Sequence, residues 1–218
     1  MSYLLRVVLP DRPGMLGAVA TALGRSGADI VSLDVVERGP DGAVDDLLVV
    51  LPAGGLADTL ITSAQSVPGV VVESLRPYHG GQELHRDLEL VEALAAKPLA
   101  GLELLVHGLP GVLRAGWAVL LTEGPTVLEA SPGAPGFGGL SLPWLPLGSA
   151  RRLATGERWV PERWRALGTE LVAAPVGSAD RAVLVGRTGG PRYRDSEVLR
   201  LAHLAGIAAT VTTADVPG

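Results

Sequence analysis

The sequence predicts an α+β protein built from two domains. Three observations lead to this prediction. Short strand-like and helix-like patterns alternate over residues 1–78, two glycines and polar residues break the pattern at 79–87, and helix patterns flank strand patterns in the remainder. Hydrophobic residues make up 47% of the 218 positions, enough for two separate cores. We therefore expect a first domain at 1–78, a linker at 79–87 and a second domain at 88–218.

The first domain is predicted from six consecutive elements. Leu16, Val19, Ala20 and Leu23 repeat at the spacing of one helix face, and Gly27 suits the left-handed residue that ends a helix. The elements are expected in the order strand 3–9, helix 15–25, strand 29–37, a turn at Gly39-Pro40-Asp41-Gly42, strand 44–51, helix 56–63, a stop at Pro68-Gly69 and strand 70–75. The order β-α-β-β-α-β is that of the ferredoxin-like split unit.

The second domain is predicted as helices at both ends of an antiparallel sheet. Residues 131–148 hold too many glycines and prolines for regular structure, which predicts a long loop. The expected elements are helix 84–96, a break at Lys97-Pro98, helix 99–113, a hairpin of strands 117–122 and 126–130, strands 169–176 and 182–186, and helix 195–209. The first helix is expected to turn Leu84, Leu88, Val91 and either Leu94 or Ala95 inward. The last helix is expected to be capped by Asp195, with Val198, Leu201, Ala202 and Ala205 inward.

Composition narrows the classes of function. The absence of cysteine excludes disulfides, a thiolate nucleophile and thiolate metal ligands. A net charge of −5 gives no basic field for nucleic acid, and no apolar run is long enough to span a bilayer. No secretory signal is apparent, so we expect a cytoplasmic protein. The only lysine precedes a proline, which excludes a P-loop. We expect no cofactor and no metal, because His79, Glu83 and His85 suggest only solvated linker residues.

The stretch LPDRPGML at residues 9–16 is the leading candidate for a binding site. Pro13 suits the first turn of a helix, and Gly14 allows close approach of a ligand. The N–H groups at this helix start would attract a carboxylate, and Asp11 or Asp29 could then meet an ammonium group. In the alternative interpretation, Asp11 only caps the helix and Gly14 only allows tight packing.

Residues 3–78 resemble the ACT domain, a ligand-binding regulatory module of the same element order. The resemblance rests on VVLPDRPGMLGAVATALGRSGADIVSLDVVE, with its Asp11-Arg12-Pro13-Gly14-x-Leu16 turn and the Gly27-Ala28-Asp29-Ile30 start of the second strand. It implies that an amino acid binds at the interface of a homodimer and controls a partner. Many family members carry Asn where this chain has Asp29. The implied ligand-binding residues are Asp11, Arg12, Pro13, Gly14, Met15, Leu16, Asp29 and Ile30.

Residues 88–212 are similar to a GAF domain, another small-molecule sensor module. The similarity rests on GWAVLLTE and on AVLVGRTGGPRYRDSEVLRLAHLAGIAATV, where Tyr193 and an acidic residue precede the last helix. GAF-fold methionine sulfoxide reductases depend on cysteine, which this chain lacks. The two resemblances together imply a non-catalytic regulatory protein in which the second domain senses another ligand or relays the signal.

Two alternatives remain open at this point. Both domains could serve as a dimerisation scaffold with no physiological small ligand. An enzyme could instead use the 131–168 loop, with Glu157, Glu162 or Asp180 as acid or base. The segment RRLATGERWVPERWR at 151–165 interleaves Arg with Trp159 and Trp164. Such a segment suggests packing tryptophans beside Arg stems or, alternatively, a lid over a pocket that Trp144 lines.

Overall fold

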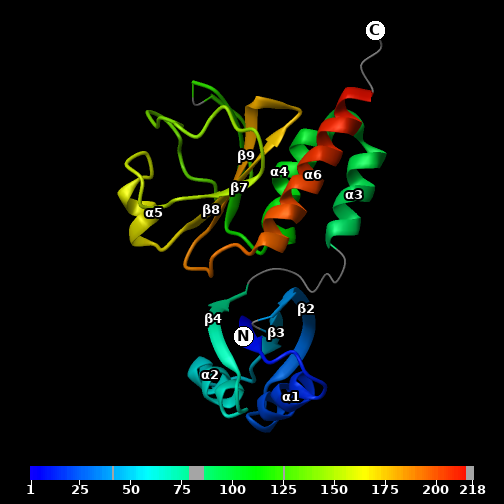
Figure 1. Cartoon of the computed structure of the whole chain (residues 1–218), viewed down its shortest axis with the longest axis vertical. Coiled ribbons are helices and arrows are strands. Elements are labelled where there is room, and N and C mark those ends of the chain that lie inside the picture. The colour runs from blue at the N-terminus through cyan, green and yellow to red at the C-terminus, as the bar shows by residue number, and fades with distance from the viewer. Residues whose placement is uncertain (41, 79–85, 125, 215–218) are drawn as a thin grey trace. The chain divides into compact units, whose positions relative to one another are not determined.

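The computed structural model describes residues 1–40, 42–78, 86–124 and 126–214 (Figure 1). Contacts divide the chain into two compact units, Met1–Leu84 and His85–Gly218, and each holds one antiparallel sheet. The α+β class predicted from the sequence is confirmed. His79, Glu83 and His85 of the predicted linker, together with Asp41 and Pro125 of the predicted turns, lie outside the described residues.

The first unit has the predicted order of elements and a four-stranded sheet. Its strand order is β2-β3-β1-β4, so β2 and β4 form the two edges and β1 pairs with both β3 and β4 (Figure 1). The elements are β1 (Ser2–Leu9), α1 (Met15–Arg25), β2 (Asp29–Gly39), β3 (Gly42–Val50), α2 (Ala57–Gln65) and β4 (Val71–Pro77).

The core of the first unit lies between its helices and one face of the sheet. Leu5, Val7 and Leu9 of β1 and Leu47 of β3 are buried there. α1 contributes Met15, Val19 and Leu23, which follow one another at i, i+4 and i+8. The predicted face of α1 is therefore wrong at its edge, since Leu16 lies one residue to the side of this stripe and is 36% exposed.

The predicted face of α2 also needs a correction. Leu60 and Ala64 are its buried residues, whereas Leu56 precedes the helix and is exposed. The predicted helix starts at Leu56, one residue before the first helical residue, Ala57. Gly69, which was expected to close this segment, has φ 85°, a left-handed conformation that glycine adopts without strain.

The second unit contains a five-stranded antiparallel sheet of order β6-β5-β9-β8-β7. Helices α3, α4 and α6 lie on one side of this sheet and long loops lie on the other (Figure 1). The elements are α3 (Arg86–Ala96), a short 3₁₀ turn (Pro98–Ala100), α4 (Gly101–Val112), β5 (Trp117–Thr122), β6 (Thr126–Ala130), β7 (Arg151–Leu153), α5 (Glu162–Ala166), β8 (Glu170–Val176), β9 (Ser178–Arg187) and α6 (Asp195–Ala214).

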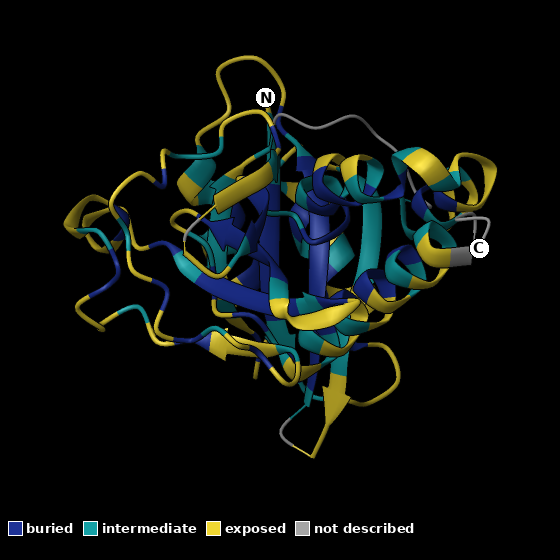
Figure 2. Cartoon of the chain, turned by 90° about the horizontal axis from the view of Figure 1, so that it is seen from above, coloured by how far each residue is buried: buried dark blue, intermediate teal, exposed yellow. Residues whose placement is uncertain are grey.

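Both faces of the second sheet are covered, which explains the continuous apolar sequence of its central strands. Ala118 and Leu120 of β5 pack toward the helices, while Trp117, Val119 and Leu121 pack toward the loops. A strand buried on both faces lacks the alternation of a half-exposed strand. Figure 2 shows these central strands in the colour of buried residues and many of the loops in that of exposed ones.

Trp117 anchors the loop side of this sheet. It lies opposite Gly186 of β9, where a β-carbon would overlap the indole ring. Its ring contacts Phe137 at 5.9 Å and Trp164 at 5.1 Å between ring centroids. The prediction that Trp159 and Trp164 are packing residues is confirmed, since both are buried in the same cluster.

Residues 131–148 contain no helix or strand, as predicted, but the following segment contains two short elements that the sequence did not reveal. β7 is a strand of three residues and α5 a helix of five, too short to show a period. In α3 the buried residues are Leu90 and Leu94, so the predicted inward position of Leu88 is wrong.

The last helix begins with a buried ion pair. α6 buries Leu201 and Ala205 as predicted, together with Leu204 and Ala208. The predicted Val198 packs against the same core as a partly buried residue, and Ala202 is also partly buried. Asp195, predicted as the cap, is instead the first helical residue. The cap is made by Glu197, whose Oε2 accepts a hydrogen bond from the Arg194 N–H at 2.8 Å.

The other Glu197 oxygen accepts a hydrogen bond from the Arg187 guanidinium, which has no exposed surface. Arg187 also donates to the carbonyl oxygens of Leu113 and Pro191, and its guanidinium lies 4.0 Å from the centroid of the Tyr193 ring. One buried cation therefore joins β9, the end of α4 and the start of α6.

Candidate functional site

The turn between β1 and α1 has the backbone geometry of a helix start open to a ligand. Gly14 precedes α1 with φ 88° and ψ −13°, in the left-handed region. The Met15 N–H donates to the Arg12 carbonyl at 3.4 Å, and the Ala18 N–H donates to the Gly14 carbonyl at 2.9 Å. The intervening N–H groups of Leu16 and Gly17 belong to the first turn of the helix, where no helical carbonyl precedes them.

Asp11 does not cap this helix. In the described part of the chain, no side-chain hydrogen bond caps the start of α1. Asp11, Arg12, Pro13 and Gly14 are all exposed, and only Met15 of the turn is buried. Arg12 lies against Met15, with its Nε 3.3 Å from the sulfur. The capping alternative is therefore wrong, and the positive end of α1 remains accessible.

A buried carboxylate lies close to this turn. Asp45 is in the middle of β3, opposite Val7 of β1, so its side chain is on the helix-covered face of the sheet. It is only 3% exposed, and its Oδ1 has no hydrogen-bond partner in the described structure. A buried, unpaired carboxylate oxygen is unfavourable and requires an explanation.

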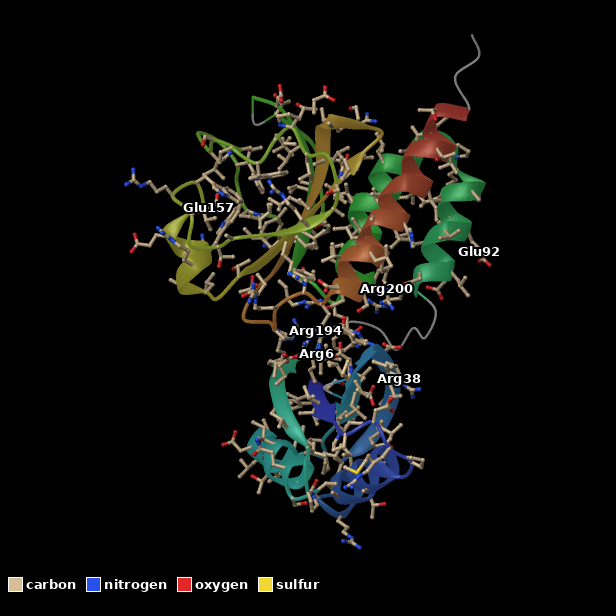
Figure 3. All side chains as sticks on the ribbon, in the orientation of Figure 1. Arg6, Arg38, Glu92, Glu157, Arg194 and Arg200 are labelled. Atoms are coloured by element: carbon tan, nitrogen blue, oxygen red, sulfur yellow. The ribbon has the colours of Figure 1, made fainter. Side chains whose placement is uncertain are left out.

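The environment of Asp45 favours its neutral form. Burial raises the pKa of Asp45 above the ordinary value of an aspartate, and the charges of Asp46 and Asp11 raise it further, while Arg38 opposes the shift. Arg38 is labelled in Figure 3 and lies near the last residue of β2, where it pairs with Ala43, two residues from Asp45. A ligand ammonium group beside Asp45 would favour the charged form and would provide the missing partner.

Replacement of Asp45 by asparagine is expected to stabilise the unliganded protein at neutral pH. The folded state holds the Asp45 proton more tightly than the unfolded chain does. Stability therefore falls as pH rises from the ordinary aspartate pKa to the raised pKa of Asp45. Asp45→Asn should remove this fall, which urea unfolding at neutral and acidic pH would measure. The exposed control Asp58→Asn should change stability by less than about 0.5 kcal/mol. Lower stability of Asp45→Asn at neutral pH would contradict this interpretation.

The structure separates the predicted site residues into two groups. Leu9, at the end of β1 next to the turn, pairs with Ala43, whereas Asp29 and Ser2 both pair with Val50. The register therefore places Asp29 and the turn at opposite ends of one sheet, roughly 24 Å apart at about 3.4 Å per residue. Ile30 lies next to Asp29 at the same end. A single chain cannot join Asp29 to the turn in one pocket.

Strand β2 presents an open edge. It has 11 residues and, among the described strands, pairs only with β3. An edge strand of a sheet is a position at which a strand from another chain can be added. Val35 on this strand is also exposed.

Asp45 was not identified from the sequence, although a signal was present. The run Val44-Asp45-Asp46-Leu47 places two carboxylates inside an otherwise apolar strand. The presence of Asp46 in this strand is explained by its ion pair with Arg6. Arg6 donates from Nε to Oδ1 at 2.7 Å and from Nη2 to Oδ2 at 2.8 Å. The described contacts give no such partner to the Asp45 Oδ1.

The residues weighed for an enzyme do not form one catalytic group. Glu157 accepts a hydrogen bond from the Trp159 indole at 2.9 Å, and Glu162 is exposed at the start of α5. A hydrogen bond from Ser178 and one from its own backbone lower the pKa of Asp180, which is fully exposed. His107 is exposed, and its Nε2 lies 3.0 Å from Oε1 of Glu129. Within the described residues, no three His, Asp or Glu side chains could hold a metal ion.

The order of elements and the antiparallel sheet define the first unit as a βαββαβ module. A model of the ACT domain family matches residues 3–69, which confirms an ACT domain in this part of the chain. The match covers under a third of the 218 residues. No curated protein matches the chain.

Several solved structures are similar at low identity. They include an unknown protein from Galdieria sulphuraria (19% identity, 56% of this chain and 70% of that chain), the regulatory subunit of aspartate kinase from Thermus flavus (12%, 94% and 92%) and a formyltetrahydrofolate deformylase from Pseudomonas putida KT2440 (14%, 94% and 94%). The TM-score is 0.32 for each, too low to bear on function. None of the helices in the described ranges is both long and apolar enough to cross a membrane.

Proposed function

We propose that this chain is a non-catalytic cytoplasmic regulatory protein whose ACT domain binds an amino acid. The observation that carries the proposal is the uncapped start of α1 together with buried Asp45, whose Oδ1 has no hydrogen-bond partner in the described structure and whose pKa is raised by burial and, to a smaller extent, by Asp11 of the turn. The helix start attracts an anionic group and Asp45 attracts a cationic group, and both belong to the first unit. An amino acid carries both complementary groups.

Each group of the amino acid would meet one part of the turn region. Its carboxylate would accept hydrogen bonds from the N–H groups of Leu16 and Gly17, at the positive end of the helix. Its ammonium group would approach Asp45 and Asp11. Pro13 and Gly14 would shape the backbone, and Arg12 and Met15 would border the side chain of the ligand. Met15 is the only one of these turn residues that is buried.

A homodimer would complete this site. Asp29 and Ile30 are too far from the turn of their own chain, so in this proposal a second copy supplies them. Pairing through the open edge of β2 would provide the interface. Asp29 would then add a further carboxylate on the ammonium side, where many family members have an amide.

The second unit would act as a GAF-like sensor of another small molecule or as a relay. The five-stranded antiparallel sheet supports this proposal, with helices on one face and long loops on the other. If both units bind ligands and are coupled, each ligand changes the affinity of the other by the same factor. A dimerisation scaffold without a ligand remains the second candidate, because the open β2 edge favours pairing with or without an amino acid.

A thermal-shift screen with the standard amino acids tests this proposal. A ligand at about 100 times its Kd should stabilise the folded state by about 2.7 kcal/mol. Gly14→Leu should abolish the shift, because its side chain would project into the open space beside the free N–H groups. A left-handed conformation also strains any L-residue by about 1–2 kcal/mol.

Gly54→Leu is the matched control for this experiment. Gly54 has φ 84° and equally open surroundings, so the variant carries the same strain at a different turn. It should melt earlier than the unchanged protein but keep the full ligand-induced shift. Equal loss of the shift in both variants would contradict the proposed site. No shift with any amino acid, together with an intact dimer, would favour the scaffold.

A further inference from the structure

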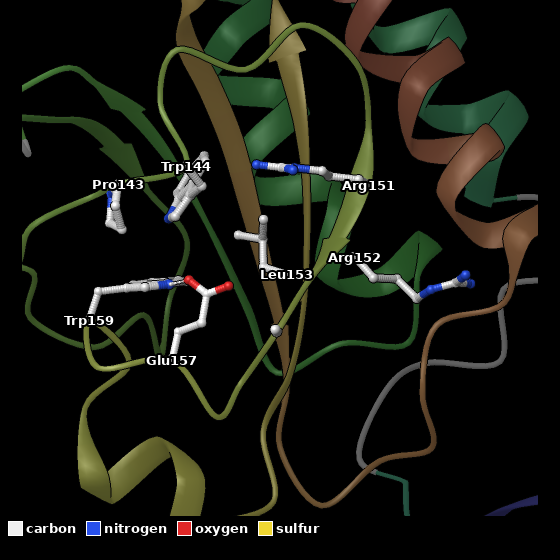
Figure 4. Close-up of a pocket in the computed structure, with 8 residues that line it drawn as sticks. Pro143, Trp144, Arg151, Arg152, Leu153, Glu157 and Trp159 are labelled. Atoms are coloured by element: carbon white, nitrogen blue, oxygen red, sulfur yellow. Dashed lines mark hydrogen bonds between the residues drawn. The ribbon is translucent and has the colours of Figure 1, made fainter.

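A pocket of about 320 Å³ lies on the loop side of the second sheet. Its walls come from the 131–148 loop, from β7 and from the segment that follows β7, as Figure 4 shows. Trp144 and Trp159 form an aromatic corner, with ring centroids 6.0 Å apart and planes at 52°. Leu153 closes the apolar side, and Figure 3 places Glu157 on the same loop side. A volume near the small end of the range for ligand pockets suits a compact molecule.

A buried hydrogen-bond donor in this pocket has no acceptor. Trp144 is 4% exposed, and its indole Nε1 has no partner in the described structure. Figure 4 shows this nitrogen directed toward Trp159 and the Glu157 carboxylate, within the pocket. Buried indole N–H groups usually find a partner. This donor therefore indicates a missing acceptor inside the pocket.

A cation borders the same space. Strand alternation places Arg151 and Leu153 of β7 on the loop side, whereas Arg152 points to the other side and pairs with Asp195 at 2.7 Å. Arg152 also donates to the Tyr193 carbonyl at 2.9 Å. In the described structure Arg151 has no ion-pair partner, and Figure 4 shows its guanidinium extended toward Trp144.

The acidic group of the pocket is already engaged. Glu157 Oε2 accepts the hydrogen bond of the Trp159 indole at 2.9 Å, which fixes this ring as one wall. The pocket therefore combines the buried Trp144 N–H, which has no acceptor in the described structure, with the exposed Arg151 guanidinium and two aromatic rings that are themselves largely buried. A small molecule with an anionic acceptor would pair with both the N–H group and the cation.

We infer that this pocket binds a small organic carboxylate, with its carboxylate on Arg151 and the Trp144 N–H. This inference rests on the part of the proposed function that makes the second unit a small-molecule sensor, and it gives that sensor a class of ligand. It does not depend on amino-acid binding by the ACT domain.

Tryptophan fluorescence of the full chain, titrated with benzoate and with the neutral isostere benzamide, tests the inference. All four tryptophans (Trp117, Trp144, Trp159 and Trp164) lie in the second unit, so the signal originates there. Benzoate should produce a saturable change. Benzamide should bind at least about tenfold more weakly, because it lacks the charge that Arg151 would pair.

Variants assign the effect to the two donors. Arg151→Gln should weaken benzoate binding at least about tenfold, and Trp144→Phe, which keeps a ring but removes the N–H, should weaken it as well. Arg163→Gln is the matched control, since Arg163 is exposed on α5 and does not line the pocket.

The outcomes separate this inference from the proposal on which it rests. Equal binding of benzoate and benzamide, or unchanged binding by Arg151→Gln, would overturn it. A fluorescence response to other small molecules but not to carboxylates would overturn the ligand class and leave the sensor role intact. No response to any member of a broad small-molecule panel would overturn both.

Discussion

Replacement of Glu197 by alanine is expected to lower the free energy of unfolding of the second unit by about 3–5 kcal/mol. The Arg187 guanidinium is fully buried and would keep its charge without the carboxylate that neutralises it. The start of α6 would also lose the hydrogen bond from the Arg194 N–H to Glu197. A loss of this size would remove a large part of the stability of an ordinary domain.

Urea unfolding followed by tryptophan fluorescence would measure this loss in the second unit. Glu92→Ala is the matched control, since Glu92 is an exposed residue of α3 that points away from the helix in Figure 3. The free energy of unfolding of Glu197→Gln should lie between those of Glu197→Ala and Glu92→Ala, because the amide can still accept hydrogen bonds but no longer neutralises the cation. Glu197→Ala and Glu92→Ala with equal stability would show that the buried ion pair has no stabilising role.

Trp117→Ala is expected to lower the stability of the second unit by about 3–5 kcal/mol. The ring lies over Gly186 and packs against Phe137 and Trp164, so its removal opens a cavity between the sheet and the loops. Unlike Glu197→Ala, this change should also loosen the loop side, because the loop cluster loses its contact with β5.

Limited proteolysis combined with urea unfolding distinguishes the two effects. Urea is added to the more stable of the two variants until both have the same free energy of unfolding. Under these conditions, protease should cut the 131–168 segment faster in Trp117→Ala than in Glu197→Ala. Leu128→Ala, which removes an exposed side chain of the neighbouring strand β6, should show neither effect. Equal cleavage rates in Trp117→Ala and Glu197→Ala would contradict the role of Trp117 as the loop anchor.

Most of the fold could be predicted from local patterns. α1 has the predicted bounds of Met15–Arg25, because Pro13, Gly14 and Gly27 mark its ends. The βαββαβ order could also be predicted, because apolar residues alternate between helix-like and strand-like spacing along the first domain. Inward faces were less predictable, and Leu16 and Leu88 were misplaced because tertiary contacts select the stripe that is buried.

The candidate site could be predicted only in part. The turn was identified because its residues are consecutive in the sequence. Asp45 was missed because its proximity to Asp11 depends on the pairing of β3 with β1. The separation of Asp29 from the turn also depends on strand register, which a single sequence does not specify. In the second unit, the pocket brings Trp144 to β7 across a loop without regular structure.

Amide hydrogen exchange of the full chain, with and without the standard amino acids, tests the central proposal most directly. We predict slower exchange for the amides of Leu16 and Gly17 and at the start of β2 when one amino acid is present, with no such change in Gly14→Leu. Exchange that stays unchanged in these segments with every amino acid, or that slows only in the second unit, would contradict amino-acid binding by the ACT domain.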